Sequence, residues 1–366
     1  MKTNQLILAT AAVLALAACN KDEFAPRNSS TDEIGFNAVT AKATKANDAI
    51  ITGTTYATDN SFKVWGWQSE AGDFSEFSTD DASNFMSDLT ISWTGGRDSR
   101  AEAWRNAANY YYWPFTGKIR FLAVHPSTVA PSTTGLDATN LKPQATFADY
   151  TISDANKTVD LMLANNEGSR RADALPMVFS HALSQIQFRA RTNEDYSGDV
   201  TFTLNSVTIN NIDLSGDLAY ANSAFTWSDN AAQTENWAYY ATPMEVAYAA
   251  NDAAAALYGA ANVMIPQNAN SDNPATADVL EGTTITISYT MEQTNSAAIT
   301  GTVTVAAPWT KVKEGDTSYD PAGAIAAWEP GKKYNYTLNF KLNEILFDPT
   351  VTDWVEVEMS TINILD

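Results

Sequence analysis

Cysteine and histidine are nearly absent from this sequence. Its 366 residues include one cysteine, Cys19, and two histidines, His125 and His181. A single cysteine can form no disulfide within the chain and leaves no second thiol for catalysis or metal binding. Neither the H-E-x-x-H zinc motif nor a Gly-rich phosphate-binding loop occurs. The sequence therefore argues against thiol enzymes, zinc proteases and common nucleotide-binding folds, and we expect no cofactor and no metal.

Positive charge is also scarce. Lys and Arg number 22 against 43 acidic residues, which gives a formal net charge of −21 at pH 7. Such an acidic chain repels polyanions, so nucleic acid and anionic membrane surfaces are poor partners.

Long apolar runs are missing except at the start. Residues 6–18 form an apolar run of about 13 residues, whereas a helix needs roughly 20 to cross a bilayer. The run follows Lys2 and ends in Leu16-Ala17-Ala18-Cys19, the small-residue cleavage pattern of bacterial lipoproteins. We predict a signal peptide over residues 1–18 and lipidation of Cys19. A leader cut by the ordinary signal peptidase, without lipid, is the alternative.

The residues after the cysteine indicate the cellular location more closely. Asn20-Lys21-Asp22-Glu23 resembles the lysine-plus-acid export tag of Bacteroidetes surface lipoproteins. We therefore expect a protein that is anchored in the outer membrane and faces outward.

Alternation of apolar and polar residues dominates the rest of the chain, and it predicts half-buried strands of antiparallel sheets. The alternating apolar positions are Val159, Leu161 and Leu163; Ile186, Phe188 and Ala190; Val200, Phe202 and Leu204; Ile285, Ile287, Tyr289 and Met291; and Tyr334, Tyr336, Leu338, Phe340 and Leu342. A change of phase between Leu204 and Val207 predicts a bulge or bend. Residues 284–291 and 301–305 predict a hairpin with a long Asn/Thr/Ser loop.

Helical patterns are few and short. One is the Ala-rich run 252–258, with Asn251 or Asp252 as its N-cap, and the other is 100–109 behind Ser99. We therefore predict an all-β protein with a few short helices.

The length favours two domains, because the chain without its leader exceeds the size of a typical single core. A polar stretch at residues 165–173 lies between two strand patterns and marks the expected boundary. We predict two antiparallel β-sandwich domains in tandem, over residues 46–172 and 173–366. A polar tether over residues 19–45 precedes them and includes a short strand with Ile34, Phe36 and Val39.

Candidate catalytic and metal sites are weak. No G-x-S-x-G motif supplies a nucleophile beside His181, so a hydrogen-bonded structural histidine is the preferred interpretation. Residues 211–217 have the spacing of a calcium loop at its first positions, but its twelfth position is Asn222 instead of glutamate, which favours a polar turn. Paired acids such as Asp80-Asp81 are typical of solvated loops, although the sequence alone leaves a glycosidase pair open.

Aromatic residues offer an alternative function. Exposed rings could stack on sugars, and the candidates are Trp65, Trp67, Trp93, Trp104 and Tyr110-Tyr111-Tyr112-Trp113-Pro114. Most aromatic residues of β-sandwiches pack inside the protein, however, so core packing is the preferred interpretation.

Four groups of motifs, in order along the chain, resemble the fimbrillin family of Bacteroidales, the subunits of type V pili. They are Ile34-Gly35-Phe36-Asn37-Ala38-Val39 with Lys42-Ala43-Thr44-Lys45-Ala46; Tyr111-Tyr112-Trp113-Pro114 with Ile119-Arg120-Phe121-Leu122-Ala123-Val124-His125-Pro126; Asp160-Leu161-Met162-Leu163-Ala164 with Met177-Val178-Phe179-Ser180-His181-Ala182-Leu183-Ser184-Gln185-Ile186; and Gly331-Lys332-Lys333-Tyr334-Asn335-Tyr336-Thr337-Leu338 with Asp353-Trp354. The resemblance implies two transthyretin-like β-sandwiches, export as a lipoprotein and no catalysis.

The resemblance also implies assembly by strand addition. A trypsin-like protease would remove the first strand, and an extended segment of another subunit would fill the groove that is left. The removed strand would carry Ile34, Phe36 and Val39. Cleavage is expected between Lys45 and Ala46, with Arg27 and Lys42 as alternatives. Lysine stands where many family members have arginine, which favours a lysine-cleaving protease or retention of the strand.

The resemblance places the candidate donor strand at the C-terminus. Its apolar residues are Val355, Val357, Met359, Ile362 and Ile364. An ordinary last strand folded into its own domain is the alternative. The sequence as a whole predicts a pilus subunit or related adhesin whose partners are other subunits and host or bacterial surface ligands. A surface glycan-binding lipoprotein is the second hypothesis and an enzyme the third.

Overall fold

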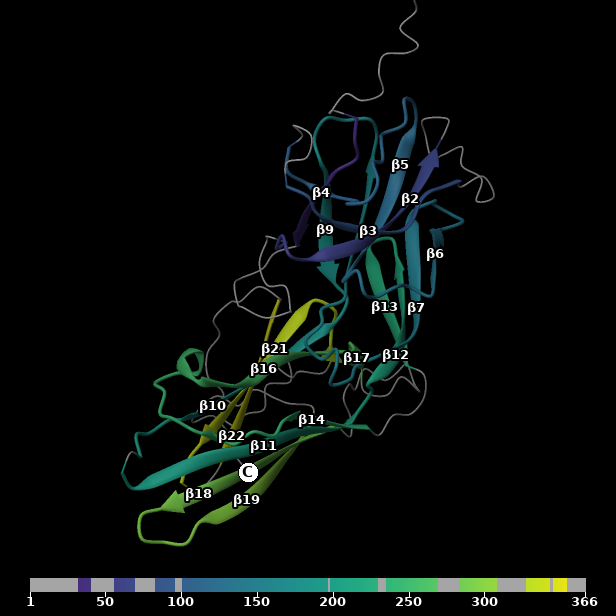
Figure 1. Ribbon diagram of the computed structural model, residues 1–366. Helices are drawn as coiled ribbons and strands as arrows, with labels where there is room; N and C mark the ends of the chain where they lie inside the picture. Colours follow the sequence, from purple (N-terminus) through teal and green to yellow (C-terminus); the bar gives the residue numbers. More distant parts are fainter. Residues whose placement is uncertain are drawn as a thin grey trace, which may run out of the picture.

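The computed structural model describes residues 32–40, 56–69, 83–95, 101–196, 198–229, 235–268, 283–307, 327–342 and 345–353. These residues form an elongated all-β molecule of several sheets, as predicted from the alternation (Figure 1). In the part of the chain just defined, no helix has the length and apolar character to cross a membrane.

The N-terminal sheet is a closed barrel with strand order β1-β4-β3-β2-β5-β8-β9. Its strands are β1 (Phe36–Thr40), β2 (Ser61–Ser69), β3 (Ser83–Trp93), β4 (Trp104–Arg105), β5 (Lys118–His125), β8 (Met162–Gly168) and β9 (Leu175–His181). Phe62, Phe121 and Met177 are among the buried side chains of the barrel core. β2 and β5 are buried on both faces, because Trp65 and Leu122 belong to a second core outside the barrel.

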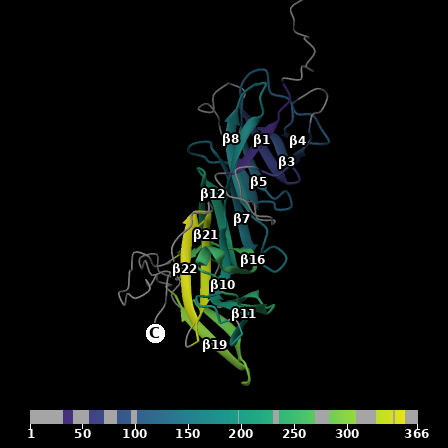
Figure 2. The same cartoon turned by 90° about the vertical axis from the view of Figure 1, so that its left-hand side faces the viewer.

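A four-stranded sheet, which we call the linking sheet, covers the outer face of β2 and β5. Its strands, in the order β13-β12-β7-β6, are β13 (Ala224–Asp229), β12 (Ser215–Ala221), β7 (Pro143–Thr151) and β6 (Thr133–Leu136). Phe147 and Leu218 of this sheet share the second core with Trp65 and Trp67. Figure 2 shows β7 and β12 between the barrel and the C-terminal sheets.

The C-terminal half is a sandwich of two sheets. One has the order β16-β10-β21-β22, with β16 (Ala256–Met264), β10 (Ser184–Thr192), β21 (Lys332–Phe340) and β22 (Ile345–Asp353). The other has the order β14-β11-β18-β19, with β14 (Glu235–Tyr240), β11 (Val200–Ile212), β18 (Thr284–Gln293), β19 (Ile299–Ala306) and β15 (Met244–Glu245) paired to β11. Their inner faces meet where the rings of Phe202 and Phe340 lie 5.6 Å apart. A short pair, β17 (Gln267–Asn268) and β20 (Ala327–Trp328), completes the described strands.

Two local strand predictions are confirmed, and the first of the two predicted helices is corrected. The register of β11 against β18 shifts between Leu204 and Ser206, where the phase change predicted a bulge. β18 and β19 form the expected hairpin, with a shorter loop because both strands extend further into it. The run 252–258 holds only a 3-10 helix, Asp252–Ala254, capped by Asn251, before β16 begins.

The prediction of a helix over residues 100–109 is wrong, because the described residues 101–109 form no helix. Trp104 and Arg105 form β4 there and pair with Trp93 and Ser92 of β3. The indole rings of Trp104 and Trp93 lie 4.5 Å apart, so burial against β3 outweighs the local helical pattern.

The expected division after residue 172 falls inside the barrel. β8 and β9, on either side of it, pair through Met162 with His181 and Leu163 with Ser180. The polar stretch 165–173 therefore covers the end of β8 and the turn towards β9. β7 and β12, which come from opposite sides of the expected boundary, also pair with each other, so the sheets are not divided at that point.

Candidate assembly site around the first strand

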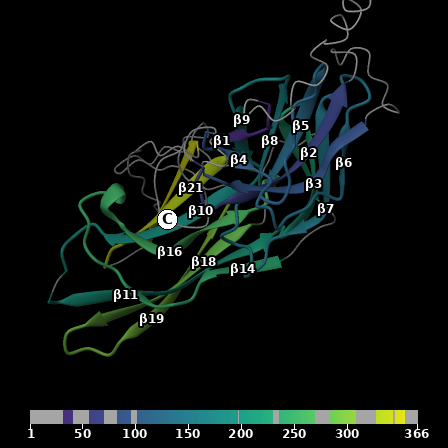
Figure 3. The same ribbon diagram turned by 45° about the horizontal axis from the view of Figure 1, so that its top comes forward.

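β1 closes the barrel, and its two edges are paired very unequally. Along one edge it runs parallel to β9 over five residue pairs, from Phe36 with Leu175 to Thr40 with Phe179. Along the other edge, the one pair that it forms within the described residues is Phe36 with Trp104 of β4. Figure 3 shows β1 beside β9 and β4. In the part of the chain that the structure describes, one ladder and one isolated pair therefore join the backbone of this strand to its neighbours.

The inner face of β1 and the side chain of Ile34, two residues before it, are buried in the barrel core. Ile34, Phe36 and Ala38 are 3%, 1% and 2% exposed. The ring of Phe36 meets those of Phe121 and Phe62 edge-on, with centroids 5.2 and 6.1 Å away. The strand therefore fills the barrel with an aromatic side chain at its centre and smaller apolar groups beside it.

The three apolar residues named for this strand do not share one face. Ile34 and Phe36 point into the core, the third inward position is Ala38, and Val39 is half-buried on the opposite face. Successive side chains of a strand alternate between faces, so a residue three positions after Phe36 cannot share its side.

The residues before β1 are held by the Tyr-Tyr-Trp-Pro motif. The N–H of Ile34 donates to the carbonyl oxygen of Tyr111 at 2.7 Å, and the N–H of Trp113 donates to that of Asp32 at 2.8 Å. The N–H of Leu175 donates to the carbonyl oxygen of Gly35 at 2.8 Å. The hydrogen-bonded segment thus begins at Asp32, before the strand proper.

Two acidic residues of this segment face arginines of the barrel. Glu33 Oε2 lies 3.5 Å from Arg105 Nε, and their side chains are only 1% and 7% exposed. The guanidinium of Arg170 donates twice to the Asp32 carboxylate, at 2.9 and 2.7 Å. A Cβ built on Gly35 would lie 3.3 Å from the Arg105 guanidinium, so positions 33 and 35 share one face.

Sequence reasoning missed these ion pairs. Asp32 and Arg170 are 138 positions apart, and no local pattern links residues at that separation. The only available indication was the acidic pair that directly precedes the alternating residues of the first strand.

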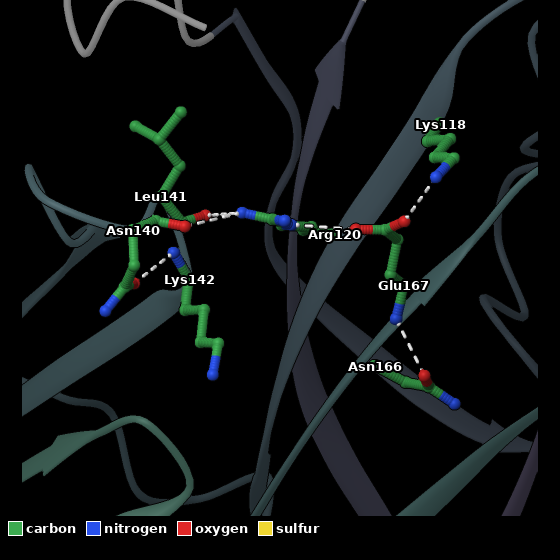
Figure 4. A network of polar contacts seen from close by, with 7 residues as sticks. All are labelled: Lys118, Arg120, Asn140, Leu141, Lys142, Asn166 and Glu167. Carbon is green, nitrogen blue, oxygen red and sulfur yellow. Dashed lines mark hydrogen bonds and ion pairs between the residues drawn. The ribbon is translucent and has the colours of Figure 1, made fainter. Parts of the chain in front are cut away.

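A charged network fixes the barrel wall made by β5 and β8 (Figure 4). The Glu167 carboxylate accepts from Arg120 Nε and pairs with Lys118 Nζ, both at 2.9 Å. Burial alone would raise the pKa of Glu167, but the hydrogen bonds from Lys118 and Arg120 outweigh it and hold the pKa below its usual value. Arg120 Nη1 also donates to the carbonyl oxygens of Asn140 and Leu141, in the connection between β6 and β7. The network ties β5 to β8 and to the linking sheet, and β1 takes no part in it.

The two histidines are core residues. His181 Nδ1 lies 2.7 Å from Asp160 Oδ2, which matches the hydrogen-bonded structural histidine preferred from the sequence. His125 Nδ1 lies 2.6 Å from the hydroxyl of Tyr56, and burial lowers the pKa of His125. Both imidazoles are 4% exposed, which leaves little room for a substrate.

The candidate sugar-binding aromatics divide between the core and the surface. Buried are Trp65, Trp67, Trp104 and Trp113; half-buried are Trp93, which packs against Trp104, and Tyr111 and Tyr112; Tyr110 is 45% exposed. The calcium-like segment 211–217 spans the end of β11 and the start of β12, as expected for a polar turn.

Several predicted site residues lie outside the described residues. They are Cys19, Arg27, Lys42, Lys45 and Ala46 before the barrel, and Val355, Val357, Met359, Ile362 and Ile364 after β22. The structure follows the chain as far as Asp353, the end of β22, which is an edge strand paired to β21.

Comparison with known proteins gives a consistent result. A model of fimbrillin-like proteins matches residues 32–354. A fimbrial protein from Bacteroides vulgatus has a similar fold, with a TM-score of 0.57 and 17% identity over 88% of this chain and 99% of that one. A structure described as a cell-adhesion protein from Bacteroides ovatus matches with a TM-score of 0.44 and 16% identity over 89% and 98% of the two chains. No protein of curated function matches the sequence.

Proposed function

The chain belongs to the fimbrillin-like family, and we propose that it is a structural or adhesive subunit of a cell-surface pilus, exported as a lipoprotein and assembled by strand addition. The leader and the lipobox at Cys19 support delivery to the outer membrane with a lipid anchor.

The position of β1 is the observation that carries the proposal. The strand supplies Phe36 and Ala38 to the barrel core, and Ile34 just before it joins them, yet only one residue pair joins the strand to β4. A cut after Lys45 would leave no covalent link between β1 and the rest of the barrel. Loss of the freed strand would leave an apolar groove and the unpaired edge of β9, and both favour an incoming strand.

The proposed replacement is the C-terminal segment of another subunit. Val355, Val357 and Met359 alternate with polar residues, so one face of such a strand could fill the groove. The ion pairs of Glu167 with Lys118 and Arg120 do not involve β1, so this wall of the barrel would keep its shape after the first strand leaves and the groove could accept a new strand.

Two measurements test the proposal. Mass spectrometry of assembled material should find an N-terminus at Ala46, and electron microscopy of protease-treated protein should show fibres. Lys45→Gln should abolish both results, whereas Lys42→Gln, the matched control, should abolish neither. Assembled fibres whose subunits all retain a lipidated Cys19 would contradict removal of the strand and indicate an anchoring subunit.

The glycan-binding hypothesis has no comparable support. Four of its five candidate tryptophans are buried, and of its three candidate tyrosines only Tyr110 is exposed.

A further inference from the structure

We propose that β19 is a lateral interaction surface, at which a second copy of this chain pairs its own β19 edge to edge. β19 ends the sheet β14-β11-β18-β19, and β18 is its one strand partner within the described residues. Figure 1 shows the hairpin of β18 and β19 at the end of the molecule away from the barrel. The surface is therefore distinct from the groove of β1, and its use does not depend on strand addition.

The outer edge of β19 presents backbone groups at every second residue. The N–H of Ala307 donates to the carbonyl oxygen of Thr283 at 2.9 Å, so the odd-numbered residues of the strand form the hydrogen-bonded pairs with β18. The N–H and C=O groups of Thr300, Thr302 and Thr304 therefore point outward. The ladder with β18 has no register shift, so this edge is regular over the whole strand.

β19 lacks the features that usually keep edge strands apart. Natural edges are protected by charged side chains, prolines or bulges. Residues 299–306 are Ile-Thr-Gly-Thr-Val-Thr-Val-Ala and include no charge and no proline. Two other edge strands are protected, because β22 carries Asp348 and Pro349 and β14 pairs with β11 through two register shifts. The edge of β19 is thus suited to pairing with another strand.

Charge favours a second copy as the partner. The chain has a net charge of −21, which opposes self-association over an acidic surface. Within residues 283–307, however, the one charged side chain is Glu292. Two copies can therefore meet at β19 without bringing acidic groups together. A strongly charged partner would find no opposite charge on this strand, so an uncharged strand such as β19 itself fits best.

The strand matches itself in an antiparallel arrangement. When a two-fold axis passes through Thr302, the backbone of Thr302 meets its own counterpart in the second copy, and Thr300 meets Thr304. The side chains of these three residues are exposed on one face. A threonine opposite a threonine is a favourable cross-strand pair. The sheets of the two copies then form one continuous sheet.

The other face of β19 supplies an apolar contact. Ile299 lies on the face that β18 turns to the core, yet its side chain is 56% exposed. Ile285 and Ile287 of β18, on the same face, are fully buried. In the proposed pairing Ile299 lies opposite Val305 of the second copy. Association therefore removes apolar surface from water, which stabilises the pair.

Crosslinking through a single cysteine tests this geometry. The uncleaved protein that begins at Asn20 contains no cysteine, so Thr302→Cys introduces its one thiol. The two copies of this residue would have Cα atoms about 5.5 Å apart, within the range of a disulfide. Oxidation should therefore yield a covalent dimer. Ala238→Cys is the matched control, because Ala238 is exposed on the same face at β14, the opposite edge of the sheet, and it should yield little dimer.

Sedimentation equilibrium of the uncleaved chain measures the association itself. The parent protein should form a dimer as its concentration rises. Thr302→Lys places two like charges directly opposite each other, so its dissociation constant should be larger by about tenfold or more. Ala238→Lys adds the same charge at the opposite edge and should leave the dissociation constant unchanged. Thermal unfolding followed by circular dichroism verifies that both variants are folded.

Three results would each overturn the proposal. They are a parent protein that stays monomeric at every concentration, a Thr302→Lys protein that associates as tightly as the parent, and equal crosslinking of the two cysteine variants. The first of these, with slow hydrogen exchange at residues 299–306, would show that other residues of the same chain cover this edge. None of these results bears on strand addition at β1, because the protein is uncleaved throughout.

Discussion

Replacement of Phe36 by alanine measures how strongly the inner face of β1 holds the strand in place. The side chain is 1% exposed and packs edge-on against Phe121 and Phe62. Truncation of a buried phenylalanine costs about 3–5 kcal/mol. Because β9 is the one described strand that pairs with β1 along its length, we expect this cost to appear as local opening of the strand.

Val39→Ala is the matched control on the same strand. Val39 is half-buried on the other face, and loss of two carbons there costs about 0.8 kcal/mol. Hydrogen exchange of residues 32–40 and 175–181, followed by mass spectrometry, reports opening of the β1–β9 ladder. Phe36→Ala should speed exchange in both segments by about 100-fold or more, and Val39→Ala by less than about tenfold. Equal effects of the two variants would refute the assignment of Phe36 to the core face and Val39 to the opposite face.

Three further outcomes are expected. Gly168→Ala should destabilise the barrel by about 1–3 kcal/mol in urea unfolding, because its Cβ would lie 2.6 Å from the Trp113 ring, whereas Gly135→Ala, with open space around it, should have little effect. Because the network lowers the pKa of Glu167, the ionised carboxylate stabilises the fold above its unfolded pKa of about 4.3, and this stabilisation is lost as the pH falls through the lower folded pKa. Glu167→Gln should therefore make the free energy of unfolding depend less on pH in this acid range. An unchanged dependence on pH would contradict the network. Cys19→Ser should abolish incorporation of labelled palmitate and retention in the membrane fraction, and persistent labelling would exclude Cys19 as the lipidation site.

Local sequence patterns predicted those parts of the fold that depend on neighbouring residues. The alternation that defines β10, β11, β18 and β21, the bulge after Leu204 and the hairpin of β18 and β19 are all confirmed, because side-chain alternation and hairpin pairing act over short separations. The cap by Asn251 was found for the same reason, since its side chain accepts from an N–H three residues on. The apolar residues of the tether also predicted the short first strand, and the structure buries Phe36 in it and Ile34 just before it.

Only the tertiary structure decided which strands become neighbours. The parallel ladder of β1 with β9, the pairing of β7 with β12 and the strand at Trp104 all depend on partners far along the chain, where local propensity is outweighed by burial. The same holds for the site, because Arg105 and Arg170 face Glu33 and Asp32 only after the barrel closes. The sequence by itself therefore determined that a short apolar strand follows an acidic pair. The fold determined that this strand closes the barrel, with its carboxylates against two arginines, because both depend on contacts between distant parts of the chain.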